Sequence, residues 1–96
     1  MKVYSESRYR ASAAEKRLYG GKTVTRFIAA PDNDPKTWFY VESFGPTPGE
    51  RKSLALKVAE LLHKYGNSKP NETYRATPGG LKGLQDSYTL LEERKK

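Results

Sequence analysis

Apolar residues between positions 48 and 65 recur at the spacing of a helix that packs on one face. Leu54, Val58, Leu61, Leu62 and Tyr65 follow at intervals that return to the same side of a helix every three or four residues. Charged residues fill many of the positions between them, so the segment is amphipathic. The pattern predicts a long helix whose apolar stripe is buried against another part of the protein.

Both ends of this segment carry signals that limit a helix. Thr47 and Glu50 have the spacing of a capping box, and Pro48 stands at the first helical position, where the missing N–H is not needed. Gly66 supplies the left-handed residue that commonly ends a helix. We therefore expect a helix over residues 48–65.

Two segments before this helix have the composition of β-strands. Residues 22–30 and 36–44 are rich in threonine, valine, isoleucine and aromatic residues. Between them, residues 31–35 read Pro-Asp-Asn-Asp-Pro, which is typical of a hairpin loop. The two segments are therefore predicted to pair as antiparallel strands.

The segment before residue 22 is open to two interpretations. Gly20 and Gly21 favour a two-residue turn, which would fold residues 16–19 back as a third antiparallel strand. Ser12 and Glu15 instead have the spacing of a capping box, which would open a short helix. We favour the strand. The predicted fold class is therefore α+β, with a three-stranded antiparallel sheet packed on one long amphipathic helix and a weaker C-terminal helix.

A register with Ala30 opposite Lys36 sorts the strand residues into two faces and places Arg26 opposite Tyr40. The first face is almost free of charge and is the expected seat of the long helix; it holds Leu18, Phe27, Ala29, Phe39 and Val41. The second face is both basic and aromatic, with Glu42 as its main acid; it holds Arg17, Tyr19, Lys22, Arg26, Lys36, Trp38 and Tyr40.

The remaining segments complete a single small domain over residues 1–96 around a sheet-plus-helix core at residues 16–66. Residues 1–13 are expected to form a polar strand or an ordered arm. Residues 67–80 are predicted to be a linker with a short strand at residues 73–76. In residues 81–96 a weaker helix is predicted, on which the recurring apolar positions are Leu81, Leu84, Tyr88 and Leu91.

The composition describes a small basic protein. A chain of 96 residues supports one modest core. Eighteen Lys+Arg against eleven Asp+Glu give a formal net charge of +7, and residues 1–30 hold seven bases against two acids. This excess favours an anionic partner, to be sought first in the N-terminal third. The absence of cysteine excludes disulfides, cysteine-ligated zinc and thiol chemistry.

Signals for a membrane, a metal or catalysis are weak. No apolar run approaches the roughly 20 residues of a membrane span, and the first residues lack a signal-peptide pattern. His63 is the only histidine, and the Asp32-Asn33-Asp34 run lacks the glycine and glutamate of a calcium loop. We therefore expect no enzymatic activity, catalytic residue, metal or cofactor, and a cytoplasmic protein, in the host cytoplasm if it is viral.

The basic and aromatic sheet face is the strongest candidate for function. Lysine and arginine neutralise phosphates, guanidinium groups hydrogen-bond base edges, and aromatic rings stack on exposed bases. We expect the protein to bind DNA or RNA as a monomer or dimer, with an N-terminal arm that adds phosphate contacts. The candidate nucleic-acid-binding residues are Arg8, Arg10, Arg17, Lys22, Arg26, Lys36, Trp38 and Tyr40.

Two alternatives stay open. If the apolar stripe of the C-terminal helix covered the second sheet face, that face would be buried rather than free; its buried residues would then be Trp38, Tyr40, Val24 and Ile28. If the C-terminal helix did not fold back onto the domain, its apolar stripe would offer a contact for a dimer. Exposed tyrosine and tryptophan also suit a protein interface. The alternative function is therefore a protein-binding inhibitor or adaptor, for instance a phage-encoded protein that blocks a host nucleic-acid-processing machine.

About half of the chain, from Arg17 to Gly66, resembles the AP2-type and integrase-arm-type DNA-binding domains. The matching features are Gly21-Lys22 before the middle strand, Lys36-Thr37-Trp38 at the start of the third, Ser43-Phe44 at its end, and Thr47 with Glu50 at the helix start. The resemblance implies a three-stranded sheet whose open face enters the major groove. By position it implicates Arg26 and Trp38, together with Arg17, Lys22 and Tyr40.

Overall fold

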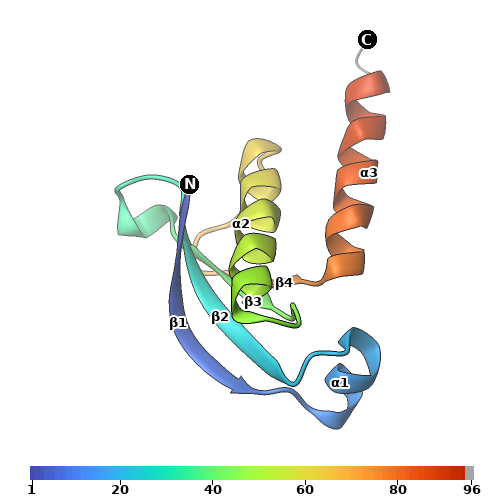
Figure 1. The fold of residues 1–96 in the computed structure, drawn as a ribbon. Coiled ribbons are helices and arrows are strands. Elements are labelled where there is room, and N and C mark those ends of the chain that lie inside the picture. The colour runs from blue at the N-terminus through green and yellow to red at the C-terminus, as the bar shows by residue number, and fades with distance from the viewer. Residues whose placement is uncertain (95–96) are drawn as a thin grey trace.

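The computed structural model describes the backbone of residues 1–94 and the side chains of residues 1–90. Within this part of the chain, a four-stranded mixed sheet is combined with three α-helices (Figure 1). The strands β1 (Lys2–Arg10), β2 (Thr23–Ala30), β3 (Phe39–Ser43) and β4 (Thr73–Ala76) lie side by side in chain order. β1, β2 and β3 are antiparallel neighbours, and β4 runs parallel to β3. The α+β class is confirmed, but the sheet has four strands where three were predicted.

Helix α2 (Pro48–Lys64) connects β3 to β4 and covers one face of the sheet. It begins where the sequence predicts, because the Thr47 hydroxyl accepts a hydrogen bond from the Glu50 N–H at 3.2 Å. Gly66, with φ of 70°, follows its C-terminal end. The side chains of Leu54, Val58 and Leu62 are buried against the sheet. This contact forms the main core.

The strand register differs from the predicted one by two residues. Arg26 lies opposite Glu42 rather than Tyr40, and Phe27 lies opposite Val41 rather than Phe39. A shift of two residues leaves every side chain on its original face, because side chains alternate along a strand. The buried face under α2 therefore contains the residues expected there, Phe27, Ala29, Phe39 and Val41.

The prediction of a strand at residues 16–19 is wrong, because these residues belong to helix α1 (Ala13–Tyr19). The Ser12 hydroxyl accepts from the Glu15 N–H at 3.1 Å, and the Glu15 carboxylate accepts from the Ser12 N–H at 2.9 Å. Gly20, with φ of 78°, ends this helix and does not form a hairpin turn. Leu18 is 72% exposed and takes no part in the core. The outer antiparallel strand is instead β1.

β1 runs from Lys2 to Arg10, which confirms the strand interpretation of the N-terminal segment. Its pairing with β2 is interrupted by a bulge between Ser5 and Ser7. Glu6 stands in this bulge, and its carboxylate reaches the guanidinium of Arg26 on β2. The bulge therefore places an acidic side chain beside the middle of the neighbouring strand.

Helix α3 (Pro78–Arg94) begins inside the segment predicted to be a linker, which also contains β4. It packs beside α2: Leu81 and Leu84 contact the main core, and the buried Tyr88 stacks on Tyr65 with ring centroids 4.0 Å apart. The C-terminal stripe thus folds back onto α2 and does not cover the second sheet face. The side chain of Leu91 lies outside the described part of the chain. No helix within residues 1–94 has the length and apolar character needed to cross a bilayer.

Candidate nucleic-acid interface

The sheet face opposite α2, here called the open face, is closed at one end by α1. Val24 on β2, Phe44 after β3 and Ala11 before α1 form a small buried cluster, and Tyr19 packs against it. The rings of Tyr19 and Phe44 lie 4.7 Å apart. This second cluster explains why α1 stays docked at the end of the sheet. It also fixes the positions of the charged residues that precede and follow α1.

Arg26 lies at the middle of the open face and is held by its neighbours. Its Nε lies 2.8 Å from the Glu6 carboxylate, and its Nη1 lies 3.4 Å from the Glu42 carboxylate. Nη2 donates to the Thr73 hydroxyl at 3.3 Å, and the guanidinium lies 4.3 Å from the Tyr40 ring centroid. Two carboxylates therefore surround its positive charge, and the guanidinium lies over Tyr40.

Tyr9 completes this network from β1. Its hydroxyl donates a short hydrogen bond to the Glu42 carboxylate. Burial, this hydrogen bond and the charge of Glu42 raise the pKa of Tyr9 above its usual range. The phenol therefore stays protonated at neutral pH, and its hydrogen bond holds Glu42 in place.

We expect Arg26→Gln to lower the free energy of unfolding by about 1 kcal/mol, because two partly exposed ion pairs and a ring contact are lost. Urea denaturation measures this change. The matched control is Lys36→Gln, which removes an exposed cation that makes no salt bridge within the described residues. Equal stability of the two variants would contradict a structural role for Arg26.

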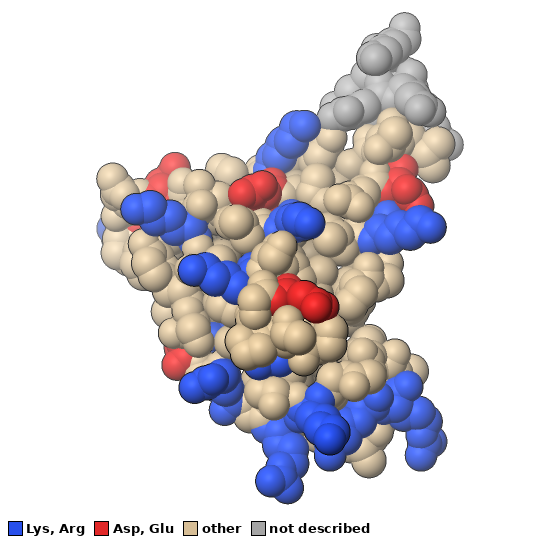
Figure 2. All heavy atoms as spheres, in the orientation of Figure 1, with Lys and Arg blue, Asp and Glu red and all other residues tan. Residues whose placement is uncertain are grey.

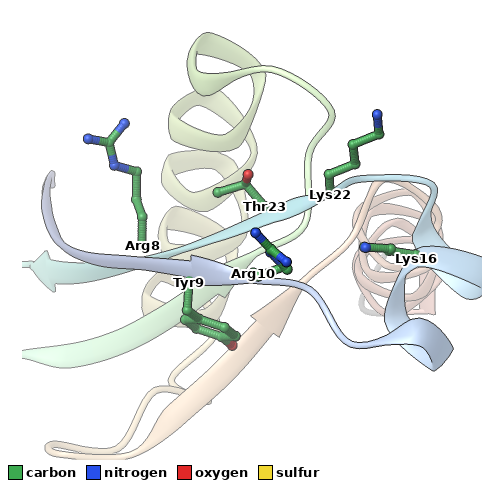
Figure 3. A pocket seen from close by; sticks show the side chains of 6 residues that line it. All are labelled: Arg8, Tyr9, Arg10, Lys16, Lys22 and Thr23. Carbon is green, nitrogen blue, oxygen red and sulfur yellow. The ribbon is translucent and has the colours of Figure 1, made fainter.

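A second group of cations surrounds a hollow of about 560 Å³ where β1, α1 and β2 meet. We call it the basic hollow; its lining residues are Arg8, Tyr9, Arg10, Lys16, Lys22 and Thr23 (Figure 3). Lys16 points from α1 back towards β1, whereas Lys22 and Thr23 come from the start of β2. Figure 2 shows Lys and Arg gathered at this end of the molecule.

The four cations of the basic hollow are all exposed, and none is ion-paired with a carboxylate in the part of the chain that the structure describes. Glu15, which adjoins Lys16 in the chain, is already used as a cap. Its hydrogen bonds with Ser12 lower the pKa of its carboxyl group. By contrast, Arg51 is buried and donates to the Thr25 hydroxyl and the Gly45 carbonyl. The basic hollow is thus a site where positive charge is free to meet a ligand.

The structure divides the predicted binding residues into separate groups. It brings together Arg8, Arg10 and Lys22 at the basic hollow. Arg17 is exposed on α1 and does not line this hollow. Arg26 and Tyr40 lie in the middle of the open face. Lys36 and Trp38 lie at the opposite end of the sheet from the basic hollow, about 25 Å away along β2. Tyr9 points to the open face, so its neighbours Arg8 and Arg10 point to the side of the sheet that α2 covers. The predicted binding residues therefore do not form one continuous face.

Sequence reasoning missed Lys16 as a member of the site. It was placed at the start of a strand, whereas in the structure it lies on α1 and faces the end of β1. The capping box formed by Ser12 and Glu15 was the signal that could have found it, because that box places the following residues on a helix.

In the described part of the chain, no group of three or more His, Asp or Glu side chains comes together as a metal site requires. The side chain of His63 is exposed on α2. Comparisons with protein-family models, curated proteins and solved structures find no match. The resemblance to AP2-type domains stays a prediction.

Proposed function

We propose that this protein binds nucleic acid through the basic hollow. The observation that carries the proposal is the set of four exposed cations around one hollow, without a carboxylate partner among the described residues. Phosphate groups are the complementary ligand, because arginine and lysine neutralise them and release their counterions. Arginine also matches two phosphate oxygens at once with its planar fork of donors.

The arrangement of the cations favours a chain of phosphates over a single anion. Arg8 and Arg10 are two residues apart on β1, which separates them by about 7 Å along the strand. Lys16 and Lys22 come from two further segments. A polyanion such as a nucleic-acid backbone meets several of these cations at once.

The ion pairs of Arg26 favour recognition of the backbone rather than of base sequence. Its guanidinium is already held by Glu6 and Glu42, so its donors are not free for base edges. Contacts to phosphates position a protein on nucleic acid without reading sequence. The proposed binding therefore depends little on sequence. The major-groove contacts that the AP2-type resemblance implies for Arg26 and Trp38 stay a prediction.

Fluorescence anisotropy with labelled oligonucleotides at several salt concentrations tests the proposal. If the four cations each neutralise one phosphate, log affinity should fall with log salt with a slope of about 3.6 on duplex DNA and about 2.8 on a single strand. Two unrelated sequences of equal length should bind equally within about threefold. No binding at low salt would overturn the proposal and favour the alternative of a protein-binding inhibitor or adaptor.

A further inference from the structure

A second hollow, of about 380 Å³, lies at the end of the open face away from the basic hollow. It is formed where the start of β1 meets the loop between β2 and β3, and Figure 1 shows these two segments together. We call it the aromatic hollow; its lining residues are Met1, Lys2, Tyr4, Ala30, Pro31, Asp32, Asn33 and Trp38. Its volume lies within the range of small-ligand sites.

The loop before β3 fixes the indole of Trp38. The Asp34 carboxylate accepts from the Lys36 N–H at 3.0 Å and opens a short 3₁₀ turn, η1 (Pro35–Thr37). The indole Nε1–H of Trp38 then donates to the Asp32 carbonyl at 3.1 Å. The only hydrogen-bond donor of the indole is therefore already paired within the protein. A ligand can contact this side chain only through the apolar face of the ring.

Tyr4 and Trp38 form an aromatic pair outside the buried clusters. Their ring centroids lie 6.2 Å apart with an angle of 34° between the planes. Tyr4 is 47% exposed and Trp38 is half-buried, and neither belongs to the main core or to the cluster beneath α1. Two large rings are thus available at the surface without being needed to fill the core.

The charged side chains that line the aromatic hollow are one of each sign. Lys2 supplies one positive side chain and Asp32 one negative side chain. The basic hollow, by contrast, is lined by four cations and no acid. The aromatic hollow therefore suits a flat, uncharged group better than a phosphate, and a nucleobase is such a group, because every base has a face that stacks on aromatic rings.

We infer that the aromatic hollow stacks an unpaired base and that the ligand of this protein is single-stranded nucleic acid. The inference rests on the proposed function, because the basic hollow supplies the phosphate contacts. The two hollows lie at opposite ends of β2, about 25 Å apart along the strand, a distance that about seven stacked nucleotides cover at 3.4 Å each. Such a length lies within the site sizes of single-strand-binding domains. Arg8 and Arg10 point to the other side of the sheet from Tyr4, so the bound strand passes over the edge strand β1 between the two hollows. In a duplex, base faces are stacked on one another and cannot reach Tyr4 and Trp38.

Trp38 provides a direct test, because it is the only tryptophan in the chain. We would titrate the full-length protein at about 50 mM salt with oligothymidylate and oligouridylate of about twelve nucleotides, and with a duplex of the same length. Either single strand should quench the Trp38 fluorescence and should bind at least roughly tenfold more tightly than the duplex.

Substitutions of Tyr4 provide the matched comparison. Tyr4→Leu should weaken single-strand binding roughly tenfold, whereas Tyr4→Phe keeps the ring and should bind like the native protein. Anisotropy and thermal melting follow affinity and folding in the same samples. Tight binding of a single strand with unchanged Trp38 fluorescence and no effect of Tyr4→Leu would overturn the inference and leave the proposed function standing. If neither the single strands nor the duplex bound, the proposed function would be overturned.

Discussion

Reversing the charge of both Arg10 and Lys22, as Arg10→Glu with Lys22→Glu, is expected to lower the affinity for a single-stranded oligonucleotide at least about 100-fold at low salt. Two phosphate contacts are lost, and two carboxylates repel the backbone at the same place. The slope of log affinity against log salt should also fall by about 1.4, because two fewer phosphates are neutralised. Fluorescence anisotropy at several salt concentrations measures both quantities.

The control for this variant carries the same total charge in another place. Lys57 on α2 and Lys82 on α3 are exposed and do not line the basic hollow. Replacing both with glutamate lowers the formal net charge by four units, from +7 to +3, as the Arg10 and Lys22 replacements do. The control should lose less than about fivefold in affinity. Equal losses in the two variants would mean that total charge, and not the basic hollow, drives binding.

Replacing Phe39 with alanine is expected to lower the free energy of unfolding by about 4 kcal/mol. The ring is fully buried between the sheet and α2, and it packs edge-on against Tyr74 with centroids 5.6 Å apart. Its removal leaves a cavity that the surrounding strands fill only in part. A loss of this size is a large fraction of the stability of a small domain. Urea denaturation followed by circular dichroism measures it.

Two further variants make this prediction specific. Phe39→Leu keeps most of the volume and should cost about 1.5 kcal/mol, so it remains measurable if the alanine variant does not fold. Leu18→Ala should change stability by less than about 0.5 kcal/mol, because Leu18 is 72% exposed on α1. A large loss for Leu18→Ala would instead support the strand that the sequence favoured at residues 16–19.

The main packing contact of the fold could be predicted from local patterns. The apolar stripe and the caps of α2 are contained within 20 consecutive residues, from Thr47 to Gly66. The assignment of Phe27 and Phe39 to one sheet face needs only the alternation of side chains. It is therefore correct even though the predicted register was wrong by two residues. These features depend little on contacts between distant segments.

The segment around α1 was predicted wrongly because two local signals competed. Gly20 is compatible both with a hairpin turn and with the left-handed end of a helix. In the structure, Ser12 and Glu15 cap the helix and Tyr19 packs on Phe44, which is 25 residues further along the chain. That contact is non-local, so the sequence does not show which signal prevails.

The partners of Arg26 could not be predicted because they depend on the exact register. In the predicted register Arg26 lies opposite Tyr40 and is free to meet a ligand. In the observed register it lies opposite Glu42, and the bulge in β1 adds Glu6. Faces have a period of two residues, but cross-strand neighbours change with each shift of register. The choice of the basic hollow over the centre of the open face therefore required the structure.

The bulge between Ser5 and Ser7 also affects how copies of this protein meet one another. β1 is an edge strand of nine residues, and an exposed edge of this length is a template for pairing with another chain. The bulge interrupts the regular spacing of its backbone groups, and Lys2, Glu6, Arg8 and Arg10 place charges along it. Bulges and charged side chains are the devices that prevent edge-to-edge aggregation of sheets. The strand that supplies two arginines to the basic hollow is thus also protected against becoming the start of a fibril.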